Sequence, residues 1–467
     1  MYDPSRKPHM RTFLPRYHLK NAVRTLSLTA LQQKGESFMR AAFYECDITP
    51  PLGGFMWGHY ARKHAKTVYD RLYAKAVVVE DAGELVAILV VDTCALPEDM
   101  HDIVTQRIFE YTGITPDRVC ITSNHSHAGA PVSDDNTVGC RADEPYKDVF
   151  YRLCADAVTL AYNRLENVEA KFGTTEVHGI SFNRDTVMED GTMITSGRGR
   201  KGTVRSLDTI DPELPVLMFE QDGKPVGAII NFACHQCCMG DLYGDNPGYS
   251  GDFSSELSKQ LKAHYGNDFV SLFVLGTCGD ISHINHVNFV PHPPLWYREM
   301  GKRLAEGVIR AANQAEPVPG GVGVFKEVIQ IERRQATPES TKEMLRRLMD
   351  VDTRFLRTRN LLYYEVNNTQ THSCLAIQAI RIGDVCISAL PGEIFVAYGL
   401  AIKAASPFKR NMVVENCNSY CGYIPTKQAF SEKSELYETY LCFHSCLIPE
   451  AGEIIQNKAL ELMNKLT

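Results

Sequence analysis

Residues 119–129, VCITSNHSHAG, combine a short apolar run with a pair of histidines at its end. The first five residues are typical of a buried β-strand. His125 and His127 stand two positions apart, and on an extended segment such residues point to the same side. Strand ends that lead into small residues are also where α/β enzymes place functional groups. The stretch therefore predicts an α/β fold with a pocket that both histidines face.

The rest of the chain continues this pattern, because short apolar runs alternate with turn residues and helical stretches. Further strands are predicted at 75–80, 85–91, 215–220, 226–232, 269–275, 376–382 and 385–390. Helices are predicted at 100–111, 148–164, 254–264, within 294–315, as a pair over 339–360, and at 452–466. We expect a mixed α/β fold, with mixed β-sheets flanked by helices in a single large catalytic domain over residues 39–467. No internal repeat is visible in the sequence.

Residues 1–38 differ from the remainder in charge. They contain seven basic residues (Arg6, Lys7, Arg11, Arg16, Lys20, Arg24 and Lys34) against Asp3 and Glu36. A continuous apolar run is lacking, so the segment does not resemble a secretory signal. We expect a poorly structured or non-native extension ahead of a start near Met39, with an organellar transit peptide as the alternative.

The bulk composition excludes several classes of function. A hydrophobic content of 44% and a charged content of 22% are ordinary for a soluble globular protein. The net charge of −7 argues against nucleic acid as a partner, and the lack of a long apolar run argues against membrane insertion. Fifteen cysteines, an odd number, lie largely in apolar runs, which favours free thiols and a cytoplasmic location. A homo-oligomer is left open.

Three later segments carry further candidate residues. His235 closes a predicted strand, Glu393 follows an apolar strand and a Pro-Gly turn, and Tyr423 lies in a polar loop. Each has an ordinary structural explanation when taken alone; a glutamate in such a place, for example, usually begins a helix. Neutral imidazole is nevertheless a preferred zinc ligand, so the histidines also suggest a metal site.

Taken in order, the motifs resemble the neutral/alkaline non-lysosomal ceramidase superfamily, specifically its amino-terminal catalytic domain. The resemblance runs from about Ala41 to the C-terminus. It rests on the segments 46–50 (CDITP), 125–129 (HSHAG), 182–184 (FNR), 211–215 (DPELP), 250–253 (SGDF), 279–282 (GDIS), 391–393 (PGE) and 422–426 (GYIPT).

The resemblance implies one Zn²⁺ per chain and assigns roles to eight residues. Its zinc ligands would be His125, His235, Glu393 and Tyr423. Its catalytic residues would be His127 beside the metal, Arg184 facing the scissile carbonyl, and Asp280 and Ser282 in a supporting or substrate-contacting loop. Zinc would lower the pKa of bound water towards ~7 and polarise the carbonyl.

Two departures from the family pattern bear on the expected class of substrate and on the role of one loop. Ser282 is followed by His283-Ile284-Asn285-His286 where the family has Pro-Asn, so the role of the two extra histidines is open. The carboxy-terminal β-sandwich domain of ceramidases is expected to be absent. Without it, a small soluble amide or ester is a better expected substrate than a membrane sphingolipid.

The leading hypothesis is therefore a zinc-dependent hydrolase that cleaves the N-acyl amide bond of a small soluble substrate with metal-activated water. The alternative keeps the metal but changes the bond, giving an esterase, a lactonase or a carbohydrate deacetylase. A third hypothesis is a cysteine hydrolase built from Cys234, His235 and Cys237. The last is a non-enzymatic binding protein that retains a decayed site.

Overall fold

Strands of the main sheets are buried on both faces. In β3 (Tyr73–Asp81), Val77 and Val79 belong to one hydrophobic core, whereas Ala76 and Val78 belong to another. Side chains alternate between the two faces of a strand, so a strand that is apolar at every position must be covered on both sides. This is why continuous apolar runs, rather than alternating ones, predicted the strands.

The computed structural model describes residues 39–59, 62–134, 140–207, 209–239, 246–347 and 351–467. The predicted extension, residues 1–38, lies outside the described residues, so its boundary stays a prediction. The predicted mixed α/β fold is confirmed. No helix within the described ranges is both long and apolar enough to cross a membrane.

The chain builds three units with the same order of elements, β-β-β-α-β-α. The first contains β1 (Arg40–Asp47), β3, β4 (Glu84–Val91), α2 (Met100–Thr112), β5 (Val119–Ser123) and α3 (Glu144–Tyr162). The second contains β7 (Glu169–Glu176), β12 (Glu213–Gln221), β13 (Lys224–Phe232), α4 (Phe253–Tyr265), β15 (Val270–Leu275) and α5 (Trp296–Asn313). The third contains β18 (Val322–Glu332), β19 (His372–Ile382), β20 (Val385–Ala389), α8 (Val396–Ala405), β22 (Arg410–Val414) and α9 (Ala451–Asn464).

Strand pairing repeats in the same way. In every unit the first three strands pair antiparallel in sequence order, and the fourth pairs parallel to the third. The short edge strands β6 (Glu166–Asn167) and β17 (Glu316–Pro317) extend the first two sheets. The structure thus contains a threefold repeat that the sequence did not show.

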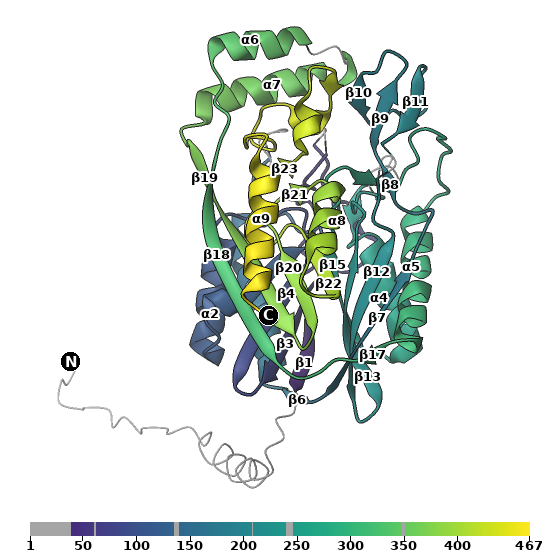
Figure 1. Ribbon diagram of the computed structural model, residues 1–467, viewed down its shortest axis with the longest axis vertical. Helices are drawn as coiled ribbons and strands as arrows, with labels where there is room; N and C mark the ends of the chain where they lie inside the picture. The colour runs from purple at the N-terminus through teal and green to yellow at the C-terminus, as the bar shows by residue number, and fades with distance from the viewer. Residues whose placement is uncertain (1–38, 60–61, 135–139, 208, 240–245, 348–350) are drawn as a thin grey trace, which may run out of the picture. The chain divides into compact units, whose positions relative to one another are not determined.

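The inner faces of the three sheets share one hydrophobic core, which draws residues from strands of all three units. Each outer face is covered by the two helices of its own unit: α2 with α3, α4 with α5, and α8 with α9. Figure 1 shows α8 beside α9. The predicted helices are present, and most of their ends are within a few residues of the predicted ones, but the pair predicted over 339–360 runs on to residue 367. The helix α8 was not predicted.

In all three units, the long connection between the first and second strands lies at the same edge of the sheet. In the first unit, Asp47 at the end of β1 lies opposite Tyr73, and Ala74 lies opposite Val91 at the end of β4. The connection from the first to the second strand therefore lies at the edge of the sheet where the third and fourth strands end. The same pairing puts it at that edge in the other two units. Ligand sites in α/β proteins form outside the carboxyl ends of strands.

These connections contain many of the remaining elements. The first holds β2 (Thr67–Val68), which pairs with β14 (Gly248–Tyr249). The second holds β8 (Phe182–Asn183), β9 (Asp185–Met188), β10 (Met193–Thr195) and β11 (Thr203–Ser206), with β16 (Ile281–Ser282) paired to β8 and β24 (Ser434–Glu435) to β10. The third holds α6 (Pro338–Arg347) and α7 (Val351–Asn367), labelled above the sheets in Figure 1. Finally, β21 (Glu393–Ile394) pairs with β23 (Tyr423–Ile424).

Candidate metal centre and its cavity

Each of the three units places one side chain of a metal-ligand type at the shared edge. His125 follows β5, His235 follows β13, and Glu393 follows β20. One ligand atom from each lies within 4.8 Å of the other two, and all three residues are buried. The threefold repeat thus brings together residues that are far apart in the sequence.

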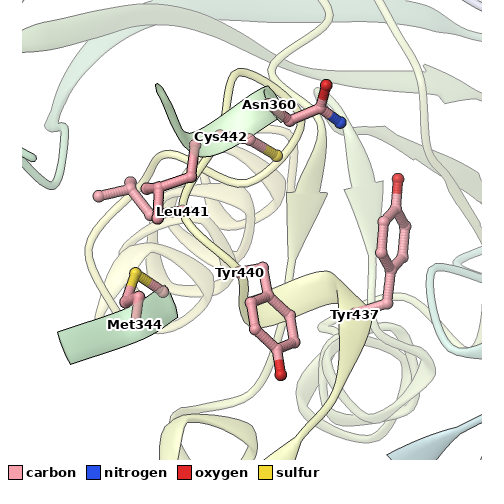
Figure 2. Close-up of a pocket in the computed structure, with 7 residues that line it drawn as sticks. Met344, Asn360, Tyr437, Tyr440, Leu441 and Cys442 are labelled. Carbon is pink, nitrogen blue, oxygen red and sulfur yellow. The ribbon is translucent and has the colours of Figure 1, made fainter. Parts of the chain in front are cut away.

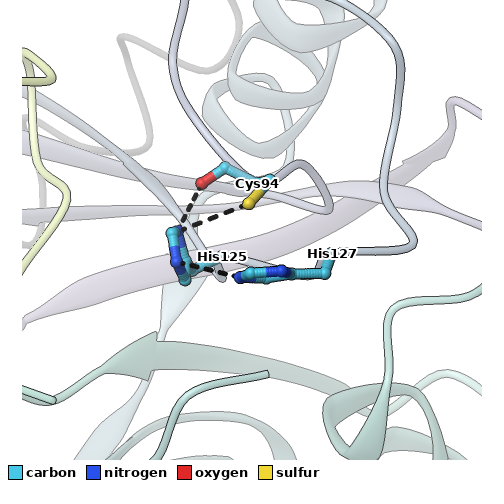
Figure 3. Close-up of side chains that lie close together, drawn as sticks. All are labelled: Cys94, His125 and His127. Atoms are coloured by element: carbon cyan, nitrogen blue, oxygen red, sulfur yellow. Dashed lines mark hydrogen bonds between the residues drawn. The ribbon is translucent and has the colours of Figure 1, made fainter. Parts of the chain in front are cut away.

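The segment that contains the histidine pair is not extended, which corrects the sequence-based prediction. His125 has a φ of 62°, in the left-handed region, so the chain turns sharply there. His125 and His127 nevertheless face one cavity, with their Nε2 atoms 3.3 Å apart. Figure 3 shows the two rings meeting beside Cys94, whose carbonyl oxygen lies 2.6 Å from His125 Nδ1. The turn, rather than the strand period, makes the two rings converge.

The hydrogen bonds of His125 and His235 fix which ring nitrogen carries the proton. His125 Nδ1 faces the Cys94 carbonyl, and His235 Nδ1 lies 3.1 Å from the Cys278 carbonyl. A carbonyl can only accept, so both Nδ1 atoms are protonated, and in a neutral imidazole the lone pair is then on Nε2. The two Nε2 atoms are only 3.0 Å apart, so the neutral forms would bring two lone pairs together.

A carboxylate oxygen completes this cluster of electron-rich atoms. Glu393 Oε2 lies 3.3 Å from His125 Nε2 and 3.4 Å from His235 Nε2. It is buried and accepts no hydrogen bond from the described residues. Three acceptors facing one another are unfavourable unless a cation lies between them. Two ligands bound at ~2.0–2.1 Å to a tetrahedral zinc ion would be about 3.3 Å apart, so the observed separations fit such an ion.

The protonation states also suit metal binding. Burial lowers the pKa of His235 well below its ordinary value, and His125 and Arg184 lower it further. Burial alone would raise the pKa of Glu393, but interaction with His125 and a hydrogen bond from Tyr420 lower it to about 2. Neutral imidazoles and an ionised carboxylate are the forms that coordinate metals.

Two tyrosines flank Glu393. Tyr423 lies directly opposite Glu393 in the parallel β21–β23 pair and lines the cavity. Tyr420 donates a hydrogen bond from its hydroxyl to Glu393 Oε1 at 2.7 Å. The sequence singled out Tyr423 but assigned no role to Tyr420. Because Tyr420 binds one carboxylate oxygen, the other is left to face the histidines.

Arg184 lines the cavity and is held there by a buried ion pair. Glu438 accepts a hydrogen bond from Arg184 Nε at 2.8 Å, and its carboxylate forms an ion pair with Arg184 Nη2 at 2.7 Å. Nη2 also donates to the Gly279 carbonyl at 2.6 Å, and the guanidinium lies 5.4 Å from the Tyr423 ring centroid. Burial alone would lower the pKa of Arg184, but the charge of Glu438 raises it well above its ordinary value. The side chain is therefore charged and firmly oriented.

Replacing Glu438 by glutamine should leave this arginine charged and buried without its counter-ion. Breaking a buried pair by removing one partner costs about 3–5 kcal/mol, and we expect the Glu438→Gln variant to lose that much free energy of unfolding. Urea denaturation measures it. Glu432→Gln, at an exposed position of the same segment, is the control and should unfold like the wild type. Equal midpoints for all three proteins would show that the pair contributes nothing.

Asp280 and Ser282 lie in different surroundings. Asp280 is buried outside the cavity lining, where its carboxylate accepts from the backbone nitrogen of Val396, at the start of α8, and from Asn183 Nδ2. Burial raises the pKa of Asp280 to about 6. Ser282 lines the cavity and accepts a hydrogen bond from the backbone of Ile284. Asp280 is thus placed to support the loop, whereas Ser282 can contact a substrate.

The cavity has a volume of about 540 Å³. Histidines are the commonest side chains in its described lining: His59, His125, His127, His235, His283, His286 and His444. The long connections of the first two units supply much of the remainder, including Lys63 and Arg198. None of His59, Lys63, Arg198, Glu438 or Tyr420 was predicted to be functional, because only the folded chain brings them together.

Tyr437 also borders a second hollow, which Figure 2 shows with Tyr440, Met344 and Leu441 around it. Its volume is about 10 Å³, room for one water molecule at most. It cannot hold a substrate.

The cysteines near the site separate into two environments. Cys234 is fully buried, its thiol contacts the Ile180 carbonyl, and burial raises its pKa well above the ordinary value, which disfavours the thiolate form that a nucleophile needs. Cys237 lines the cavity, with its sulfur 3.7 Å from His283 Nδ1. All fifteen cysteines are free thiols.

Fold and site together define a mixed α/β protein with a buried His-His-Glu cluster of metal-ligand type in a polar cavity. Residues 43–287, more than half of the chain, match the family described as neutral/alkaline non-lysosomal ceramidase, N-terminal. The chain belongs to this family. His125, His235 and Arg184 lie within the matched residues, whereas Glu393 and Tyr423 lie beyond them.

Solved structures extend the likeness of fold to most of the chain. The crystal structure of neutral ceramidase from Pseudomonas aeruginosa superposes with a TM-score of 0.71 at 19% sequence identity, covering 92% of this chain and 75% of that one. A structure titled ceramidase complexed with C2 gives a TM-score of 0.70, with the same identity and the same coverage. No curated protein matches the sequence.

Proposed function

We propose that the chain is a zinc-dependent hydrolase that cleaves an amide bond of a small substrate. The observation that carries this proposal is the convergence of His125 Nε2, His235 Nε2 and Glu393 Oε2 on one point of the cavity. Membership of a family named for an amide-cleaving activity supports the choice of bond. Tyr423, beside Glu393, is the proposed fourth ligand.

A zinc ion bound there would supply a Lewis acid for the scissile carbonyl and an activated water for its hydrolysis. The surrounding side chains would then transfer the proton to the leaving nitrogen and stabilise the negative charge on the carbonyl oxygen. His127 Nδ1 faces the Gly58 carbonyl at 3.1 Å, so Nε2 is the atom that can take a proton and return it to the leaving nitrogen. Arg184 presents a fixed positive charge to the cavity, where it can stabilise negative charge that develops on the carbonyl oxygen.

Matched substrates test the type of bond. We expect the zinc-loaded protein to cleave an anilide and, faster, the phenyl ester of the same acid, since a phenolate is the better leaving group. Both activities should disappear after treatment with a chelator. Cleavage of the ester alone would favour the esterase, lactonase or deacetylase alternative. Loss of activity on thiol alkylation, without sensitivity to a chelator, would instead favour a cysteine hydrolase using Cys237 and His283.

The tyrosine behind Glu393 provides a milder test of the metal site. Tyr420→Phe removes only the hydroxyl that binds Glu393 Oε1. Loss of a group that orients a metal ligand typically costs 10- to 100-fold in metal affinity, and we expect a decrease of about that size. Competition with a zinc-binding dye measures it. Tyr440→Phe, a tyrosine outside the main cavity lining, should bind zinc as tightly as the wild type. Unchanged affinity in Tyr420→Phe would contradict Glu393 as a ligand.

A further inference from the structure

His286 is a buried polar side chain that the proposed mechanism does not use. It is only 2% exposed and lines the cavity. Neither ring nitrogen has a hydrogen-bond partner anywhere in the described part of the chain. Buried polar groups are nearly always paired, and the exceptions in native structures usually have a functional explanation. A group on a bound molecule could provide the missing partner.

A basic, glycine-rich loop lies against His286. The loop follows β10 and has the sequence SGRG over residues 196–199. Its Gly199 backbone nitrogen donates to the His286 carbonyl at 3.1 Å, so the two segments are joined. Ser196 and Arg198 both line the cavity, and the positive charge of Arg198 acts on His286. An arginine and an imidazole thus share one part of the cavity wall.

The composition of the cavity lining favours an anionic ligand over one with long apolar chains. Ile284 is the sole aliphatic side chain among the lining residues that the structure describes. In the same lining, Glu393 is the sole carboxylate, whereas Lys63, Arg184 and Arg198 are cationic. A pocket for long alkyl chains would be lined mainly by apolar side chains. This one presents many N–H donors instead.

We propose that His286 and Arg198 form an anion subsite that binds a carboxylate of the amide substrate. This inference rests on the proposed function and narrows its substrate class from small amides to amides that bear a carboxylate. The guanidinium and one imidazole N–H can each donate to one carboxylate oxygen. Burial, together with the charges of Arg198, Arg184 and the nearby His283, lowers the pKa of His286 to about 3, so its imidazole is a neutral donor.

Two pairs of probes test the subsite and locate the carboxylate. N-acetylphenylalanine and N-acetyl-2-phenylethylamine differ by a carboxylate on the amine side. N-succinylaniline and N-butyrylaniline differ by one on the acyl side. We expect the zinc-loaded enzyme to cleave at least one acidic member with a kcat/KM at least about tenfold above that of its neutral partner. Equal or better cleavage of the neutral member in both pairs would overturn the proposal.

Variants connect this preference to the two residues. Arg198→Gln should lower the preference about tenfold, mainly by raising KM for the acidic member, and His286→Ala should act in the same direction. Arg198 is exposed, so its replacement should not prevent folding. Arg200→Gln removes the same charge two positions away, outside the lining, and should keep the preference. A preference that survives in both Arg198→Gln and His286→Ala would overturn the proposal.

Binding measurements separate this inference from the proposed reaction. If the wild type cleaves no amide, the proposed function fails, but the subsite can still be measured by titration calorimetry with N-acetylphenylalanine and N-succinylaniline. Binding of either acid that is lost in Arg198→Gln and kept in Arg200→Gln would support the subsite alone. Failure of both acids to bind the wild type would overturn it.

Discussion

His125→Ala and Glu393→Ala are each expected to remove zinc from the protein and to reduce amide cleavage on the order of 10³-fold or more. In the wild type, elemental analysis should find about one zinc per chain, because the two candidate ligand groups among the described residues, Cys94-His125-His127 and His125-His235-Glu393, share His125. Either substitution removes one of the three converging acceptors and leaves the other two with Tyr423, a set that should bind zinc far more weakly. Titration calorimetry with zinc would show the loss of affinity directly.

A surface histidine supplies the matched control for this experiment. His178 lies on the protein surface, where its Nε2 is 2.8 Å from Glu176, and His178→Ala should keep both zinc and activity. Removing the ion from the wild type with a chelator should reproduce the loss, and adding zinc back should restore it. Full activity in metal-free protein would rule out the mechanism. A zinc content unchanged by both substitutions would place the ion elsewhere.

The sequence predicted the fold class because local patterns determine it. Apolar runs of strand length, separated by turns, were sufficient to find β3, β4, β5, β12 and β13 with nearly correct ends. The strand β18 was missed because it alternates buried and exposed residues irregularly and begins directly after the glycine pair at 320–321. Its identity as a strand depends on its long antiparallel pairing with β19, which is a tertiary interaction.

The threefold repeat could not be predicted from the sequence for a related reason. A β-β-β-α-β-α unit requires apolar side chains at buried positions but does not require the same ones, so sequence identity between units can vanish while the pairing persists. The ligand set shows this most clearly. His125 follows the fourth strand of its unit, whereas His235 and Glu393 follow third strands, so no shared local motif marks the three positions.

The family resemblance could assign roles to individual residues, but it could not predict the contacts that hold those residues in place. Glu438 lies 254 positions from Arg184, and Tyr420 lies 27 positions from Glu393. Neither contact has a local pattern, since a buried ion pair or hydrogen bond depends only on where two side chains meet in the fold. The same is true of His286, which the sequence flagged as a departure from the family without indicating that it is buried and unpaired.

His127→Ala is expected to keep zinc and to lower kcat by about 10²- to 10⁴-fold, the range for loss of a general acid-base group. The structure gives the reason. The acceptor cluster of His125, His235 and Glu393 is complete without His127, whose Nε2 faces the cavity beside it. KM should change little if His127 acts on the proton and not on substrate binding. Loss of zinc in this variant, equal to that in His125→Ala, would show that His127 is itself a ligand.

Gly58 allows the same role to be tested with His127 still present. The Gly58 carbonyl lies 3.1 Å from His127 Nδ1, and a Cβ at position 58 would come within 2.7 Å of that nitrogen. Gly58 also has a φ of +85°, which disfavours alanine. Gly58→Ala should therefore displace the imidazole, and a misplacement of about 1 Å can cost about 10²-fold in rate. A kcat lowered in both variants with zinc retained would assign the proton transfer to His127. A normal kcat in Gly58→Ala, with a displaced ring visible in its crystal structure, would remove His127 from the reaction.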